Sequence, residues 1–336
     1  MKTIPTVGII LTTYNKGVYI LEAIESLKKQ TFQDFEIHIV DDGSNDGVTH
    51  GIIRKLKYDK ITEVFAHVDN RGVAIRQKEQ YKIMNNKYLL ILCGDDVLAS
   101  TFLEKTVGFL EKHKDYGAIS VNVKLFDKTP EDAFLVSEYS EEKITLPHLL
   151  ARNHVLGSSL MRGKAIKEAD LSGGFMRYQD WDRWISMMEK GWKIGLIKEP
   201  LFYYRQEPKS LSHTATIADE MEIRRKLLTK HKENYRRFYD EIIMDMEYAF
   251  LEMKEGKDWL DAQYYGHIGE IKKLKRQIEE LSRRIGKLDR TIETKDDVID
   301  KLNTDLERQD SLKFLLKKRI KKIEKKMLRR RENVED

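Results

Sequence analysis

The fold is decided by the stretch Phe35-Glu36-Ile37-His38-Ile39-Val40 and the residues that follow it, Asp41-Asp42-Gly43-Ser44. Isoleucine, valine and phenylalanine favour a strand, and the Asp-Asp-Gly-Ser sequence is typical of a turn or a helix cap. Three further β-rich runs occur in the first 95 residues, at Val7–Thr12, Ile61–Val68 and Tyr88–Cys93.

Helical patterns separate these strands. Ile20, Ile24 and Leu27 lie four and three residues apart, which is the spacing of one helix face, and a second helix is expected over 73–86. Regular alternation of strands and helices predicts parallel β-α-β units and therefore an α/β fold.

Polar clusters follow three of the predicted strands, at Thr12–Asn15, Asp41–Ser44 and Gly94–Asp96. Open parallel sheets bind ligands at the carboxyl ends of their strands. We therefore expect the three clusters to form one composite site.

Composition limits the class of protein. The 336 residues contain no run of 18 apolar residues, so a transmembrane helix is not expected. The N-terminal residues lack the apolar core of a signal peptide, and the single cysteine, Cys93, cannot form an internal disulfide. The sequence predicts a soluble, cytoplasmic protein.

The formal charge of +5 is unevenly distributed. Residues 313–331 contain eleven lysines and arginines and one acid, Glu324, so this segment carries +10 and the rest of the chain −5. Apolar residues recur on one face of this basic segment. Such a helix can lie on an anionic membrane surface at the inner face of the cell membrane, or it can be a solvated end of a coiled coil. No nucleic-acid-binding motif accompanies it, so a nucleic-acid partner is not expected.

A heptad repeat precedes the basic segment. One core position holds Ile271, Ile278, Ile285, Ile292, Ile299 and Leu306, and the other holds Leu274, Leu281, Leu288 and Leu302. β-Branched residues alternating with leucine favour a parallel two-stranded coiled coil. We expect a homodimer that pairs through residues 263–312. The alternative is an amphipathic helix that packs on its own chain.

Together the motifs of the first 213 residues resemble family 2 glycosyltransferases. In the first half these are Thr12-Thr13-Tyr14-Asn15, Asp41-Asp42-Gly43-Ser44, Asn70-Arg71-Gly72 and Gly94-Asp95-Asp96. The second half adds Gly157-Ser158-Ser159-Leu160-Met161-Arg162, Ser172-Gly173-Gly174-Phe175, Tyr178-Gln179-Asp180-Trp181-Asp182-Arg183-Trp184, Gly191-Trp192-Lys193-Ile194 and Glu199-Pro200-Leu201-Phe202-Tyr203-Tyr204-Arg205.

The resemblance implies a GT-A fold, which is a Rossmann-like, mostly parallel sheet flanked by helices. It also implies an inverting enzyme that transfers a hexosyl or N-acetylhexosaminyl group from a nucleotide-sugar, with UDP as the default, to a cell-envelope glycan, a lipid-linked or a protein acceptor. The expected organisation is a GT-A domain over 1–217, a helical connector over 218–262, the coiled coil over 263–312 and the basic tail over 313–336.

By the same resemblance, each motif residue has an expected role. Asp180 is the general base, and Asp182 is the fallback. The resemblance places the nucleotide-sugar against Thr12, Tyr14, Asp41, Asp42, Arg76 and Asp95, and a Mn²⁺ or Mg²⁺ ion against Asp95, Asp96 and His213. Taken alone, Asp41–Ser44 also fits a plain turn, Asp95-Asp96 and Asp180 also fit helix caps, and Arg76 also fits an exposed helical cation.

Three positions depart from the family pattern. Cys93 and Gln179 stand where acids are usual, and Glu207 stands where many relatives have histidine. Two other functions remain open: a GT-A-fold scaffold that binds nucleotide with little catalysis, and a sugar nucleotidyltransferase. The nucleotidyltransferase is less favoured because Thr12-Thr13-Tyr14-Asn15-Lys16 is not the Gly-rich, Arg-containing loop of that class.

Overall fold

The computed structural model describes residues 4–133, 135–137, 139–172, 174–207, 216–289 and 295–331. The chain divides into two compact units, Met1–Asp245 and Met246–Asp336.

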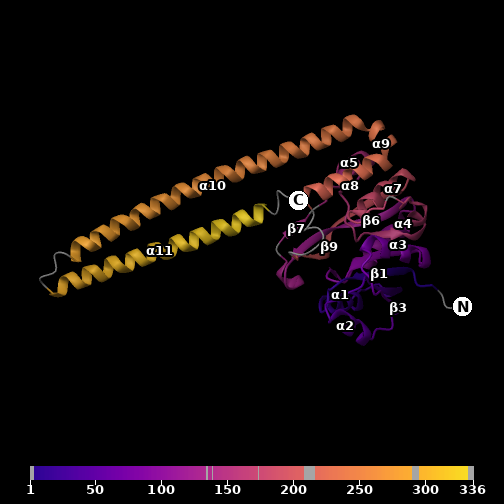
Figure 1. Cartoon of the computed structure of the whole chain (residues 1–336), viewed down its shortest axis with the longest axis horizontal. Coiled ribbons are helices and arrows are strands. Elements are labelled where there is room, and N and C mark those ends of the chain that lie inside the picture. The colour runs from indigo at the N-terminus through magenta and orange to yellow at the C-terminus, as the bar shows by residue number, and fades with distance from the viewer. Residues whose placement is uncertain are drawn as a thin grey trace. The chain divides into compact units, whose positions relative to one another are not determined.

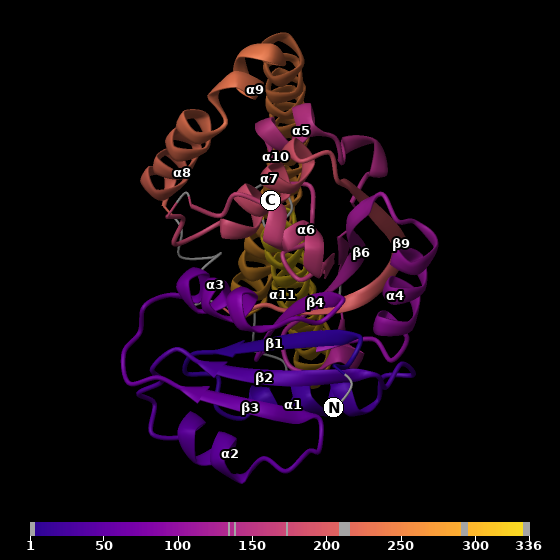
Figure 2. The ribbon, with the colours of Figure 1, turned by 90° about the vertical axis from the view of Figure 1, so that its right-hand side faces the viewer.

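A mixed β-sheet forms the centre of the first unit. Its strand order is β3-β2-β1-β4-β8-β6-β9-β5, and β7 pairs with β6. Figure 2 shows the first four strands as neighbouring ribbons, β4, β1, β2 and β3 from top to bottom. These four run parallel, whereas β8 is antiparallel to both β4 and β6. The strands are β1 Val7–Thr13, β2 Phe35–Asp41, β3 Ile61–Ala66, β4 Tyr88–Cys93, β5 Val97–Leu98, β6 Tyr116–Phe126, β7 Leu135–Ser137, β8 Leu160–Arg162 and β9 Lys193–Arg205.

Helices cover both faces of this sheet. Successive residues of a strand point to opposite faces, so neighbouring apolar residues pack against different helices. Ile9 of β1 belongs to an apolar cluster with α1 and α4, while Ile10 belongs to a second cluster with α3, α5, α6 and α7. These helices, with α2, are α1 Tyr19–Lys28, α2 Thr49–Lys55, α3 Val73–Ile83, α4 Phe102–Lys112, α5 Leu146–Ala151, α6 Gly163–Glu168 and α7 Gln179–Glu189; short 3₁₀ turns lie at Pro130–Asp132 and Glu141–Lys143.

The α/β class predicted from the first 95 residues is confirmed. All four predicted strands are present, and the helix predicted over 73–86 is α3, which ends three residues earlier because Met84 adopts an extended backbone. The second half of the sheet, from β5 to β9, was not predicted. β6 runs parallel to β9 over ten positions, although the paired residues of β9 lie about 80 positions later in the chain, and local sequence patterns do not reveal such a pairing.

Two further helices, α8 Ile217–Lys230 and α9 Lys232–Arg237, also pack on the first unit. Leu227 is fully buried, and it joins Ile223 in the cluster that contains α5 and α7. The first unit therefore extends beyond residue 217, where the sequence pattern placed the end of the catalytic domain.

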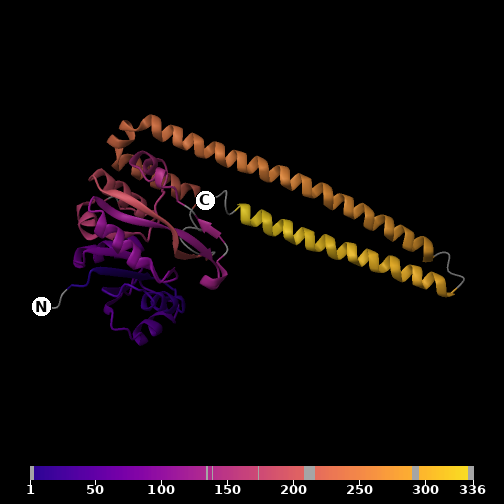
Figure 3. The same cartoon turned by 180° about the vertical axis from the view of Figure 1, so that it is seen from behind.

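The second unit is helical. It contains most of α10 Tyr239–Asp289 and all of α11 Lys295–Arg331. These two helices lie side by side and run in opposite directions in Figures 1 and 3, and Gln309 of α11 donates a hydrogen bond to Ser282 Oγ of α10 at 2.5 Å. The heptad repeat is thus divided between two helices instead of continuing through one. Parallel pairing of two chains stays a prediction.

None of the helices in the described ranges combines the length and the apolar character that crossing a bilayer requires. Lys317, Lys318 and Lys321 of α11 are exposed, and contact of this basic segment with a membrane stays a prediction.

The packing of α8 can be tested with two neighbouring leucines. Leu227→Ala should lower the free energy of unfolding by about 2–5 kcal/mol because it leaves a cavity in the core. Leu228→Ala is the matched control. Leu228 is half exposed, so its truncation should change stability by less than about 0.5 kcal/mol.

Urea unfolding followed by tryptophan fluorescence measures both values, since three of the four tryptophans, Trp181, Trp184 and Trp192, lie in the first unit. Equal effects of the two substitutions would contradict the assignment of α8 to this core.

Candidate functional site

Three polar clusters meet at one edge of the parallel strands. β1 lies between β2 and β4, with Thr13 opposite Asp41 and Thr12 opposite Cys93. The backbone N–H of Asp42 donates to Thr13 O at 3.0 Å, and the N–H of Gly94 donates to Thr12 O at 2.8 Å. The residues predicted to form one composite site are therefore adjacent.

At the end of β2, two buried aspartates have different partners. Asp41 Oδ1 accepts hydrogen bonds from the hydroxyl and the backbone N–H of Ser44 at 2.5 and 3.2 Å. Asp42 instead accepts from the backbone N–H groups of Arg71 and Gly72 at 2.9 and 2.7 Å. Asp42 thus fixes the loop before α3 against the end of β2.

The turn that follows β2 needs a glycine at position 43. Gly43 has φ +78°, and a Cβ there would lie 2.5 Å from the backbone carbon of Asp69. This close approach brings the 69–72 loop onto Asp42.

Arg76 on α3 completes the same cluster. It is 2% exposed, and its guanidinium donates to Asp42 Oδ1 at 2.7 Å and to Asp69 at 2.7 and 3.0 Å. In the structure Arg76 therefore supports Asp42. Contact of Arg76 with a diphosphate stays a prediction.

The two residues predicted to line a nucleotide base are Thr12, near the end of β1, and Tyr14, in the loop that follows. Thr12 is buried, while Tyr14 is 40% exposed at the strand end. The next residue, Asn15, has the left-handed value φ 54°, and its side-chain oxygen accepts hydrogen bonds from the N–H groups of Asn45 and Asp46. The loops that follow β1 and β2 are thus tied together.

Carboxylates and a thiol gather at the end of β4. Cys93, Asp95 and Asp96 each offer a ligand atom, and these atoms lie within 4.8 Å of one another. Burial, together with the charges of the two aspartates, raises the pKa of the Cys93 thiol well above its ordinary value, so the thiol is neutral. Burial and the charge of Asp95 likewise raise the pKa of Asp96.

This donor set fits a hard divalent cation. Mg²⁺ and Mn²⁺ prefer carboxylate oxygens, and the two adjacent aspartates supply them without the neutral thiol. His213, the third predicted ligand, lies outside the described residues.

Basic side chains surround these aspartates. Arg205, at the end of β9, donates its backbone N–H to Asp96 Oδ1 at 3.1 Å and its Nε to the Asp95 carbonyl at 2.9 Å. Lys16 Nζ lies 2.6 Å from Asp95 Oδ2 and also bonds Glu207. The motifs that contain Lys16 and Arg205 gave neither residue a role, because their partners lie about 80 or more residues away in the chain.

Asp180, the predicted general base, lies in the first turn of α7. Asn153 Nδ2 donates to Asp180 Oδ2 at 2.9 Å. A Cβ on Gly157 would lie 3.3 Å from the same oxygen, so the glycine allows the 153–157 segment to pass close to the carboxylate. Arg183 holds this segment in place by donating to Gly157 O at 2.9 Å.

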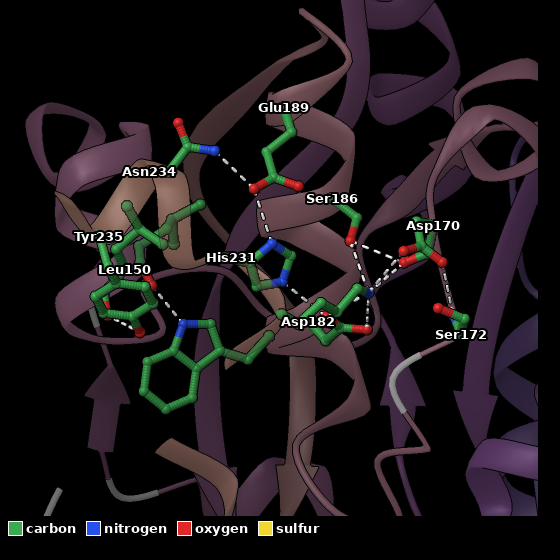
Figure 4. A network of polar contacts seen from close by, with 12 residues as sticks. Leu150, Asp170, Ser172, Asp182, Ser186, Glu189, His231, Asn234 and Tyr235 are labelled. Atoms are coloured by element: carbon green, nitrogen blue, oxygen red, sulfur yellow. Dashed lines mark hydrogen bonds and ion pairs between the residues drawn. The ribbon is translucent and has the colours of Figure 1, made fainter. Parts of the chain in front are cut away.

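Asp182 belongs to a different environment, which Figure 4 shows in close-up. It is 3% exposed and accepts hydrogen bonds from Lys230 Nζ at 2.7 and 2.8 Å and from His231 Nε2 at 2.9 Å. His231 Nδ1 lies 2.8 Å from Glu189, which also accepts from Asn234. Asp182 is therefore engaged in joining α7 to α8 and α9, which its position in the motif did not reveal.

The defining sequence pattern of glycosyl transferase family 2 matches residues 8–178, which is half of the chain. The chain belongs to glycosyl transferase family 2. The enzyme class inferred from the motifs is thereby confirmed.

Two glycosyltransferases of similar sequence match this chain over most of their length. An uncharacterised glycosyltransferase of Methanocaldococcus jannaschii is 28% identical over 208 residues, which cover 60% of this chain and 71% of the relative. The putative teichuronic acid biosynthesis glycosyltransferase TuaG of Bacillus subtilis is 26% identical over 210 residues, covering 62% and 82%.

Solved structures support the GT-A fold. TarS of S. aureus has a TM-score of 0.51 at 20% identity, and the match covers 67% of this chain but only 39% of TarS. The mannosyltransferase PcManGT of Pyrobaculum calidifontis, solved with GDP-Man and Mn²⁺, has a TM-score of 0.51 at 15% identity and covers 76% of both chains. At these identities the likeness establishes the fold.

The His231 contacts generate a pH prediction. Burial alone would lower the pKa of His231, but its hydrogen bonds to Asp182 and Glu189 outweigh burial and raise the pKa above 6.5. A raised pKa in the folded state means that protonated His231 stabilises the fold fully below pH 6.5. This contribution is lost as the pH rises through the raised value.

His231→Gln measures this contribution. The difference in unfolding free energy between the native chain and the variant should be largest below pH 6.5 and should shrink as the pH increases. His113→Gln, at an exposed position of the same unit, controls for the substitution itself. A difference that grows with pH would show that His231 is buried in its neutral form.

Proposed function

We propose that this protein is a metal-dependent inverting glycosyltransferase. It transfers a sugar from a nucleotide-sugar, with UDP as the favoured nucleotide, to a hydroxyl group of a cell-envelope glycan, a lipid-linked or a protein acceptor. Asp180 is the proposed general base.

The observation that carries this proposal is the pair Asp95 and Asp96 at the end of β4, beside the end of β1. Their carboxylates would hold Mn²⁺ or Mg²⁺, which would neutralise charge on the diphosphate leaving group. Thr12, Tyr14, Asp41 and Asp42 lie on the neighbouring strand ends, where the nucleoside is proposed to bind.

The molecules bound in the similar structures support a nucleotide-sugar donor. A TarS fragment, residues 1–349, was solved with UDP, at a TM-score of 0.50 and 19% identity over 67% of this chain. PcManGT was solved with GDP-Man and Mn²⁺. TuaG is named for teichuronic acid biosynthesis, which supports a cell-envelope acceptor.

In the proposed reaction the acceptor oxygen attacks the anomeric carbon while Asp180 takes the hydroxyl proton. The new C–O bond forms as the bond to the diphosphate oxygen breaks, and the nucleoside diphosphate leaves with the electron pair. Asn153 holds one oxygen of Asp180. A fixed carboxylate suits a base because proton transfer requires hydrogen-bond distance to the acceptor.

Asp180→Asn tests the base. The variant should bind UDP in the presence of Mn²⁺ as the native chain does, because Asp180 is not among the residues assigned to the nucleotide or the metal. Release of UDP from UDP-sugars should fall at least ~100-fold, which is typical for loss of a general base. Thermal shift with UDP and Mn²⁺ reads binding, and a coupled UDP assay across several UDP-sugars reads turnover.

Asp182→Asn is the matched control two residues away. It should lower the unfolding free energy, because Asp182 bonds Lys230 and His231, while the folded variant keeps turnover. Retained turnover in Asp180→Asn would place the base elsewhere. Binding of UDP with Mn²⁺ but no turnover of any donor by the native chain would favour a nucleotide-binding scaffold.

We also propose that two chains pair through the heptad face of α10. Met246, Phe250 and Met253 continue the repeat upstream of Ile271, at spacings of four and three, and each is 42–57% exposed. An apolar seam with this spacing can be buried by the same seam of a second copy. The proposal covers the N-terminal part of α10 in addition to 263–312.

Phe250→Glu tests this pairing against Leu251→Glu. Leu251 is 51% exposed against 57% for Phe250, but it lies off the seam. Sedimentation velocity should show a dimer for the native chain and for Leu251→Glu, and a shift toward monomer for Phe250→Glu, because a charge would have to enter the seam. A monomeric native chain would contradict the pairing.

A further inference from the structure

The neighbours of Lys16 on both sides are held in place, one by the loop that follows β2 and the other by the first residue of α2. The backbone N–H of Asn15 donates to Ser44 Oγ at 2.8 Å, and the N–H of Gly17 donates to Thr49 Oγ1 at 2.9 Å. Because both neighbours are fixed, the side chain of Lys16 leaves the loop in a defined direction.

That direction brings the ammonium group between two carboxylates from other strand ends. Lys16 Nζ lies 2.6 Å from Asp95 Oδ2, after β4, and it bonds Glu207, after β9. The three side chains are 13–22% exposed, so water screens their charges only in part. Burial lowers the pKa of Lys16, but Asp95 and Glu207 outweigh it, so the pKa is raised and the ammonium stays charged.

Lys16 therefore touches an oxygen of the same carboxylate that is proposed to bind the metal. The guanidinium of Arg205 is engaged elsewhere. It donates to the backbone carbonyls of Asp95, Asp127 and Lys128 and pairs with Glu22. A divalent cation on Asp95 would meet the Lys16 ammonium at close range, and two cations on one carboxylate repel each other.

We propose that Lys16 is an internal competitor for the metal: its ammonium occupies Asp95 and bridges it to Glu207, and so it sets how tightly the site binds a divalent cation. This inference rests on the proposed metal site at Asp95 and Asp96. It assigns Lys16 a role in metal affinity, distinct from any contact with the sugar or the acceptor.

Mn²⁺ binding to the full chain without nucleotide tests the inference, measured by calorimetry and by the electron paramagnetic resonance signal of free Mn²⁺. Lys16→Met should lower the Mn²⁺ dissociation constant roughly tenfold, since it removes a positive charge beside Asp95. Lys16→Arg keeps the charge and should remain close to the native value.

Lys87→Met is the matched control. Lys87 directly precedes β4 at the opposite end of the strand from Asp95, and it pairs with Glu111. The Lys87→Met substitution removes one positive charge, as Lys16→Met does, but away from Asp95 and Asp96, so Mn²⁺ affinity should not change. Circular dichroism checks that each variant is folded.

An unchanged or weaker affinity in Lys16→Met would overturn the inference and leave the metal site standing. Absence of Mn²⁺ binding in both the native chain and Lys16→Met would overturn the inference together with the metal site. Asp95→Asn, which should lose Mn²⁺ binding, separates specific binding from adventitious binding.

Discussion

The placement of β1 between two parallel partners is the constraint on which the site depends. Because β2 and β4 both run parallel to β1, their carboxyl ends stop at the same edge, with Asp41 and Cys93 opposite consecutive residues of β1. The loops that leave these ends can then share hydrogen bonds. Asn15 contacts the loop after β2, and Lys16 contacts the turn after β4.

Convergence of strand ends also concentrates charge, and the protein compensates most of it locally. Asp42 is paired with Arg76, and Asp95 is paired with Lys16. Asp96 is the exception. It is 2% exposed and accepts one backbone N–H from Arg205, so burial and the neighbouring charge of Asp95 raise its pKa. The charges of Lys16 and Arg205 offset this rise only in part, so an added cation would further stabilise the charged form of this buried carboxylate.

Local sequence patterns were sufficient to predict the four parallel strands and to place the motifs at their ends. The strands are short apolar runs followed by turn residues, and both signals lie within ten residues of each other. Local sequence patterns could not predict contacts between residues that are far apart in the chain. Lys16 and Glu207 are 191 positions apart, and His231 and Asp182 are 49 apart. Nothing within the motif distinguishes Asp180 from Asp182, because both are acids in the first turn of one helix.

The structure separates these two acids by what packs around each. Asp182 is fixed from the C-terminal side of the chain, by Lys230 and His231, whereas Asp180 is fixed from the 153–157 segment. The family pattern ends at residue 178, before either acid. The helix that carries the proposed base is therefore held by α8 and α9, which lie outside the matched region, and a domain that ended at residue 217 would lack the partners of Asp182. Residues 218–245 belong to the same compact unit as α7, and two of them, Lys230 and His231, contact it through Asp182.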